Sequence, residues 1–143
     1  MDKIQQFFAR YEEGANTFDA DLVCSLYTPE FMGADPGGAS GGRNDDGLRS
    51  AISERKAFFQ QIGFRSAKVL DVQATALDQH YTMAKVHWHM VFEKEPGQAL
   101  NFKFFITYFL YDPGTGPKAV FWISHEDEQK VMREAGLIAE ASN

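Results

Sequence analysis

The spacing of hydrophobic residues divides the chain into a helical first part and an alternating second part. In the first part, apolar residues recur every three or four positions, which is typical of helices with one buried side. Asp19, and then Asn44 or Asp45, stand where N-caps are expected, and Gly63 stands where a helix would close. The pattern predicts helices over about residues 2–14, 20–27 and 45–62.

After Gly63 the apolar residues alternate with polar ones, which is typical of strands that bury one face. Four long strands are expected in this region, and a short strand is expected between the second and third helices. A short helix follows the last strand. The expected strands cover residues 30–34, 65–77, 81–93, 99–112 and 118–125, and the final helix covers residues 126–135.

The segment of residues 99–112, ALNFKFFITYFLYD, is expected to run through the middle of the sheet. Both of its faces are apolar, with Phe104 and Ile106 on one and Phe105 and Phe109 on the other. A strand with no wet face has something packed on both sides. Helices followed by antiparallel strands predict an α+β fold, with three N-terminal helices on the concave face of a curved sheet. We expect one domain over residues 1–143.

The expected strand over residues 81–93 has a clearer division into faces. Its apolar residues Val86, Trp88 and Met90 alternate with His87 and His89, so the apolar set is predicted to face inward. The two histidines then share the convex side. No third or fourth ligand accompanies them, so we expect no metal site.

Composition narrows the classes of partner. The net charge of −6 argues against nucleic acid, which binds basic surfaces. No segment approaches the ~20 apolar residues that span a bilayer, and the charged, amphipathic start lacks a secretory core. Cys24 is the single cysteine, so no internal disulfide is expected. We expect a cytoplasmic protein, whose aromatic content of 14% requires a large core, an interface or an apolar pocket.

The stretch GGASGGRNDDG after Pro36 is the most glycine-rich segment of the chain. It contains no lysine and lacks the spacing of phosphate-binding loops. We interpret residues 37–47 as a flexible loop that could act as a lid.

Three polar residues are candidates for chemistry. Asp35 precedes Pro36, so it is either a general base in a pocket or a residue that opens a turn. Tyr11 is either a hydroxyl donor facing a cavity or an ordinary core tyrosine of an amphipathic helix. His125 ends the last strand and is either a pocket group that titrates near neutrality or a strand-end residue bonded to backbone.

The order of elements resembles that of the nuclear transport factor 2-like superfamily, which includes ketosteroid isomerases and polyketide cyclases. The strongest match runs without a gap from Arg10-Tyr11 to Asp35-Pro36. The resemblance implies a cone-shaped fold whose cavity contains an oxyanion-binding Tyr11 and a proton-shuttling Asp35. Thr107 stands where those isomerases keep a second, acidic oxyanion donor.

The expected catalytic set is therefore Asp35, Tyr11, Thr107 and His125. The expected pocket lining is apolar and consists of Phe59, Val86, Trp88, Met90, Phe105, Phe109, Phe121 and Ile123. The leading hypothesis is a small-molecule isomerase or lyase that transfers protons without a cofactor. The alternatives are a non-catalytic module that binds an apolar ligand or partner, and a structural dimerisation domain. The resemblance also implies a homodimer through the convex face of the sheet.

Overall fold

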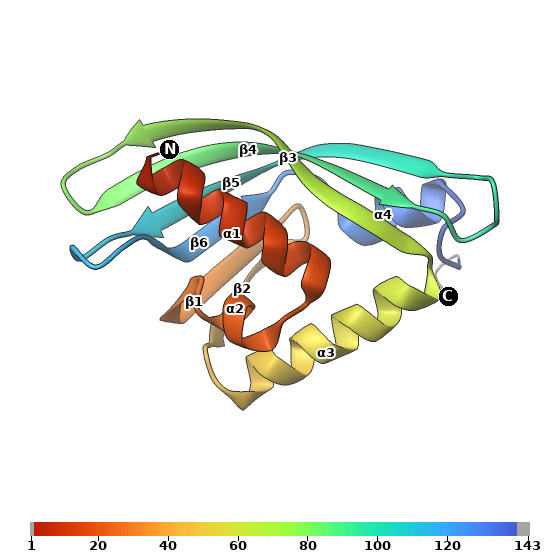
Figure 1. The fold of residues 1–143 in the computed structure, drawn as a ribbon, viewed down its shortest axis with the longest axis horizontal. Helices are drawn as coiled ribbons and strands as arrows, with labels where there is room; N and C mark the ends of the chain where they lie inside the picture. Colours follow the sequence, from red (N-terminus) through yellow and green to blue (C-terminus); the bar gives the residue numbers. More distant parts are fainter. Residues whose placement is uncertain (1, 140–143) are drawn as a thin grey trace.

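A six-stranded curved sheet arches over three helices in the computed structural model, which describes residues 2–139 (Figure 1). The strand order is β2-β1-β6-β5-β4-β3. Every neighbouring pair is antiparallel except β1 and β6, which are parallel. The strands are β1 (Tyr27–Asp35), β2 (Gly38–Arg43), β3 (Phe64–Ala76), β4 (Tyr81–Phe92), β5 (Leu100–Tyr111) and β6 (Lys118–Ser124). The α+β prediction is confirmed, and β5 lies inside the sheet as expected.

Each helix begins after an aspartate whose side chain accepts a backbone N–H of the first turn. Helices α1, α2 and α3 lie on the concave side of the sheet, as predicted, and α4 follows the last strand (Figure 1). No helix within residues 2–139 is long and apolar enough to cross a membrane. The helices are α1 (Lys3–Thr17), α2 (Ala20–Cys24), α3 (Asp46–Gln61) and α4 (Glu128–Glu134).

Two expectations need correction between α2 and α3. The second helix ends at Cys24, so Tyr27 begins β1 instead of ending a helix. The glycine-rich stretch is largely a strand, because β2 pairs with β1 in a hairpin that closes at Asp35 and Gly38. Ladder pairing uses backbone N–H and C=O groups, so a segment almost without side chains can join a sheet and leave no hydrophobic pattern.

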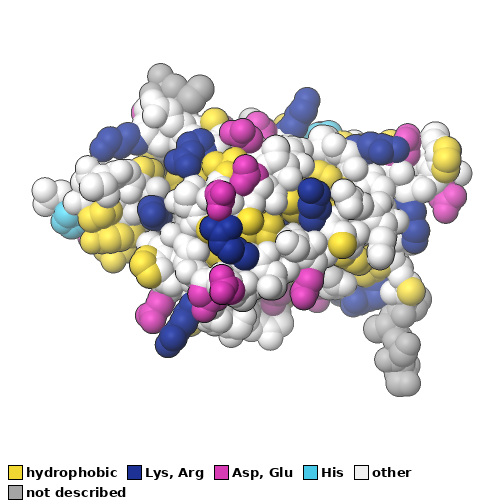
Figure 2. All heavy atoms as spheres, turned by 60° about the horizontal axis from the view of Figure 1, so that its bottom comes forward, with side chains coloured by type: hydrophobic (Ala, Val, Ile, Leu, Met, Phe, Trp, Pro, Cys, Tyr) yellow, Lys and Arg dark blue, Asp and Glu magenta, His cyan; other side chains and the backbone are white. Residues whose placement is uncertain are grey.

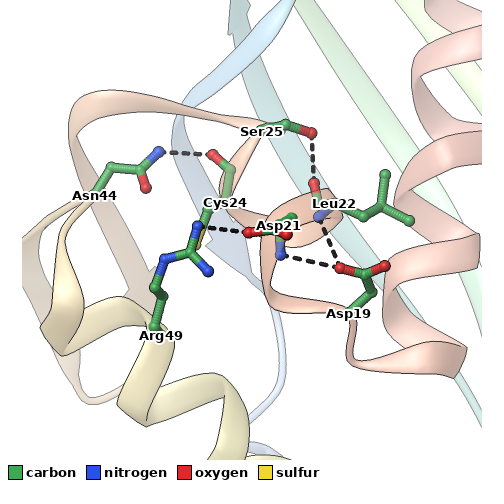
Figure 3. Close-up of polar contacts among 7 residues, drawn as sticks. All are labelled: Asp19, Asp21, Leu22, Cys24, Ser25, Asn44 and Arg49. Carbon is green, nitrogen blue, oxygen red and sulfur yellow. Dashed lines mark hydrogen bonds and ion pairs between the residues drawn. The ribbon is translucent and has the colours of Figure 1, made fainter.

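Side chains from α3 and the preceding loop fix the start of β1 (Figure 3). The Asn44 amide nitrogen donates to the backbone oxygens of Cys24, at 2.7 Å, and Tyr27, at 3.1 Å. Arg49 of α3 forms an ion pair of 2.8 Å with Asp21 of α2. These contacts hold the end of α2 against α3 and thereby set where Tyr27 enters the sheet.

The core lies between the concave face and the helices. Residues directly opposite each other in neighbouring strands share a face, and β4 and β5 pair Trp88 with Phe104 and Val86 with Ile106. The even-numbered residues of both strands therefore point toward the helices. Fully buried members of this core include Phe8, Phe59, Val86, Phe92, Tyr108 and Leu110.

Candidate functional site

A cavity of ≈ 830 Å³, partly open to solvent, lies between the concave face of the sheet and the helices. This volume lies within the range of pockets that hold small molecules, about 300–1,000 Å³. The walls are mainly aromatic and aliphatic, as such pockets require. Among the lining residues are Ile52 and Phe59 from α3, Trp88 and Met90 from β4, Phe102, Phe104 and Ile106 from β5, and Val131 and Met132 from α4.

Three tyrosines and a tryptophan, all of which line this cavity, form a cluster of polar groups. The hydroxyls of Tyr11 in α1 and Tyr27 in β1 are 2.6 Å apart. The Trp88 indole N–H donates to the Tyr108 hydroxyl at 3.0 Å. The rings of Tyr11 and Tyr108 are in contact, with centroids 5.1 Å apart. Four separate elements thus bring these side chains together.

Burial keeps the three hydroxyls protonated. Desolvation raises the pKa of Tyr11 and Tyr27 well above the ordinary tyrosine value, and it also raises the pKa of Tyr108. The charge of Arg55 opposes the shift in pKa at all three, but it is a lesser cause. At neutral pH the cluster therefore presents hydroxyl groups and no phenolate.

Counting protons shows that the cluster has a donor to spare. Each hydroxyl has one proton to donate. One proton is used between Tyr11 and Tyr27, and at most one more between Tyr11 and Tyr108, because a hydrogen bond between two hydroxyls uses the proton of only one of them. At least one of the three O–H groups then has no acceptor among residues 2–139. That donor is available to an oxygen of a bound molecule.

Asp35 also lines the cavity, but as an exposed residue at its mouth. One carboxylate oxygen accepts the backbone N–H of Gly37 at 2.8 Å, in the turn between β1 and β2. This is the contact of an aspartate that opens a turn. The structure thus places Asp35 and Tyr11 on one cavity, with the carboxylate at the edge and the hydroxyl in the interior.

Thr107 and His125 do not belong to the cavity, which corrects the expectation for both. They lie on the convex side of the sheet, where the Thr107 hydroxyl and the His125 Nε2 are 2.7 Å apart. Thr107 is at an odd-numbered position of β5, so its side chain points to the face opposite that of the cavity-lining Phe104 and Ile106. Thr107 is also paired with Ile123 of β6, so that part of β6 has the same orientation.

The prediction is also wrong for four of the expected lining residues, because they alternate with the cavity-lining residues along their strands and so face the convex side. These residues are Phe105, Phe109, Phe121 and Ile123. In their place β5 contributes Phe102, Phe104 and Ile106, and β6 contributes Trp122 and Ser124. Of the other expected lining residues, Phe59, Trp88 and Met90 line the cavity, whereas Val86 is on the same side but fully buried in the core.

Charged side chains stand at the mouth. Figure 2 shows a face on which acidic and basic side chains surround hydrophobic atoms near the middle of the molecule. Arg55 of α3, Asp35, Glu126 and Glu128 of α4 line the cavity and are at least partly exposed. Within residues 2–139 no group of three or more His, Cys, Asp or Glu side chains is placed to hold a metal ion.

Sequence reasoning missed Tyr108, Trp122 and Arg55 as cavity residues. A signal existed for Tyr108, because it has the same parity in β5 as Phe104 and Ile106 and bears the only hydroxyl among them. Trp122 could be placed only by knowing which face of β6 is concave. The sequence pattern of α3 places Arg55 on the exposed side of the helix. Only the position of α4, whose Glu128 pairs with Arg55, makes it part of the site.

Comparisons with solved structures show the fold. An NTF2-like protein with a cystatin-like fold from Novosphingobium aromaticivorans has 17% identity and a TM-score of 0.70, covering 96% of this chain and 88% of that one. Aln2 from a Streptomyces species has 12% identity and a TM-score of 0.71, covering 92% and 93%. The beta subunit of the benzoate 1,2-dioxygenase from Burkholderia mallei has 16% identity and a TM-score of 0.69, covering 90% and 91%.

Sequence comparison shows the family. No curated protein matches this chain. A family model described as NTF2-like protein (DUF6841) matches residues 2–127, which is most of the chain. The curved sheet with helices on its concave side agrees with that assignment. The chain belongs to the NTF2-like protein family DUF6841.

Proposed function

We propose that the protein binds an apolar, carbonyl-bearing small molecule in the cavity of the concave face. The observation that carries this proposal is the spare hydroxyl donor of the Tyr11–Tyr27–Tyr108 cluster inside an apolar cavity. A buried donor without an acceptor is costly, and a ligand oxygen would supply the acceptor. The apolar walls would supply the rest of the binding free energy through burial of ligand surface.

Binding is favoured over proton transfer because of where Asp35 lies. A general base must reach the proton that it abstracts, and an apolar environment would raise its basicity. The Asp35 carboxylate is instead exposed and occupied by the Gly37 N–H. Isomerase or lyase activity stays the second candidate, supported by the fact that Asp35 and Tyr11 line one cavity.

The binding proposal is tested with fluorenone and fluorene, two planar tricyclic molecules that differ by one carbonyl oxygen. We expect fluorenone to bind more tightly by roughly 2- to 10-fold for each neutral hydrogen bond that its carbonyl oxygen accepts. The infrared carbonyl stretch of bound fluorenone should lie below its value in an apolar solvent. Equal affinities and an unshifted carbonyl band would contradict the proposal.

Two variants separate binding from proton transfer. Changing Tyr11, Tyr27 and Tyr108 together to Phe should lower the preference for fluorenone by roughly 2- to 10-fold while fluorene still binds, with circular dichroism as the check of folding. Tyr81→Phe is the matched control, because Tyr81 lies outside the cavity. Asp35→Asn should leave both affinities unchanged. A loss of fluorenone binding in Asp35→Asn would favour the second candidate.

For the convex face we propose a homodimer. Its middle strands expose or half-expose aromatic side chains, among them Phe105, which is 39% exposed, and Phe109 and Phe121, whose rings are in contact with each other. Large apolar side chains gathered on one sheet face are typical of protein interfaces. A second copy of the same face would cover them symmetrically.

A further inference from the structure

Trp122 is held flat against β1 by the absence of a side chain at Gly33. A Cβ atom at Gly33 would lie 2.8 Å from the indole ring and 3.0 Å from its nitrogen, which is closer than side chains tolerate. On its other sides the indole contacts the rings of Tyr27, at 5.2 Å, and Phe31, at 5.5 Å between centroids. Two aromatic rings and a backbone without a side chain thus fix the indole in the wall of the cavity.

The Trp122 indole N–H has no hydrogen-bond partner among residues 2–139, unlike that of Trp88, which donates to Tyr108. Within those residues, every side-chain nitrogen or oxygen that is cut off from solvent does have a partner. The Trp122 N–H is therefore accessible, and the space that Trp122 lines is the cavity. An indole nitrogen can only donate, so this group too requires an acceptor.

We infer that Trp122 is a ligand-binding residue whose indole N–H donates a second hydrogen bond to the carbonyl oxygen of the bound molecule. The inference rests on the proposed function. A carbonyl oxygen has two lone pairs and accepts two donors. The Trp122 ring is in contact with that of Tyr27, whose hydroxyl belongs to the tyrosine cluster, so the indole lies next to that cluster in the wall of the cavity. The ring of an aromatic ketone would contact the Trp122 ring, which lines the cavity.

This arrangement names the ligand class more narrowly than an apolar cavity does. The cavity offers two donors in its interior, whereas its carboxylates stand at the mouth. A planar aromatic ketone meets both donors through one oxygen. A primary amine of the same shape has a single lone pair, so it would leave one of the two cavity donors without an acceptor.

The test is an indole N–H spectrum of the full chain, labelled with nitrogen-15. The chain has two tryptophans, so two indole signals are expected, and Trp122→Phe assigns them. In the free protein the Trp122 signal should exchange with water faster than the Trp88 signal. Fluorenone should shift the Trp122 signal downfield and slow its exchange, and fluorene should do neither.

The outcomes separate this inference from the proposed function. Fluorenone that binds while the Trp122 N–H keeps exchanging freely would overturn the role of Trp122 and leave the binding proposal standing. Binding of neither molecule would overturn both. In Trp122→Phe, which keeps an aromatic ring, the preference for fluorenone over fluorene should fall by roughly 2- to 10-fold, the contribution of one neutral hydrogen bond. An unchanged preference would also count against the inference.

Discussion

Arg55 and Glu128 form a two-point ion pair that joins α3 to α4 across the mouth of the cavity. The guanidinium nitrogens lie 2.9 Å and 3.3 Å from the two carboxylate oxygens. The guanidinium carbon also lies 4.1 Å from the centre of the Phe59 ring. The two residues are 73 positions apart in the sequence, and both line the cavity. The pair therefore joins two walls that are formed by distant parts of the chain.

Removing the charge of Arg55 should loosen α4. Partly exposed pairs of this kind contribute about 0.2–1 kcal/mol, so Arg55→Met should accelerate amide exchange in α4 by up to roughly 5-fold. Hydrogen exchange read by mass spectrometry measures this. Arg49→Met is the matched control, because Arg49 lies on the same helix but pairs with Asp21 of α2. The double variant Arg55→Glu with Glu128→Arg should restore slow exchange. If the amides of α4 exchange as slowly in Arg55→Met as in the wild type, the ion pair does not hold α4 in place.

The tyrosine cluster should make the protein sensitive to alkali. In the folded state the pKa values of Tyr11, Tyr27 and Tyr108 are raised by burial, whereas in the unfolded state they are near 10. Stability from these groups is therefore complete below pH of about 10 and falls as pH rises above it, because the unfolded state then releases protons that the folded state keeps.

Tyrosinate absorbance and circular dichroism, followed together through an alkaline titration, measure this effect. Of the five tyrosines, these three should ionise only as the fold is lost. The variant with phenylalanine at all three positions should lose this coupling between ionisation and unfolding. Ionisation of all five tyrosines with an intact far-ultraviolet spectrum would contradict the assignment.

Two phenylalanines on the concave side should differ in their importance for stability. Phe8→Ala should cost about 3–5 kcal/mol in free energy of unfolding, because Phe8 is 1% exposed and packs against Tyr108. Phe104→Ala should cost less, about 1–2 kcal/mol, since its ring already faces open space and its loss enlarges an existing cavity. Urea unfolding measures both. Equal costs would mean that the cavity is closed around Phe104.

The proposed dimer predicts a concentration-dependent mass in sedimentation experiments. Phe105→Glu should shift the protein to monomer at micromolar concentration, because it would bury a charge on each side of a symmetric interface. Ser53→Glu on the exposed surface of α3 is the control and should leave the dimer intact. A monomeric wild-type protein would remove the proposal, whatever the variants do.

The elements and their order followed from the sequence because hydrophobic spacing reports directly on burial. Helices with aspartate caps and the long strands β3 to β6 are where the pattern predicts them, within a few residues. The exception is β2, which is mostly glycine, alanine and serine and therefore has no hydrophobic pattern that would predict a strand. In β4, the polar residues Lys85, His87 and His89 mark the outer face, and the inward set was assigned correctly.

The candidate site was less predictable because β5 carries no such mark. Aromatic residues occupy both of its faces, and Lys103 is its only charged residue. Parity fixes which residues share a face but cannot say which face is concave. Since Thr107 pairs with Ile123 and Phe109 with Phe121, the faces expected to line the cavity on β5 and on β6 both lie on the convex side of the sheet. The pairing of Trp88 with Phe104 shows that Phe104 lies on the concave face, because residues directly opposite each other share a face. This pairing is known only from the register of the hairpin between β4 and β5.

The two-sided character of β5 has a consequence for how this chain can vary. Phe104 and Ile106 serve the cavity while Phe105 and Phe109 serve the convex surface, so a substitution at any one position alters a single surface. Insertion or deletion of one residue within the strand would exchange the two sets beyond that point. We therefore expect length to be strictly maintained in β5, whereas residue identity can drift independently on its two sides.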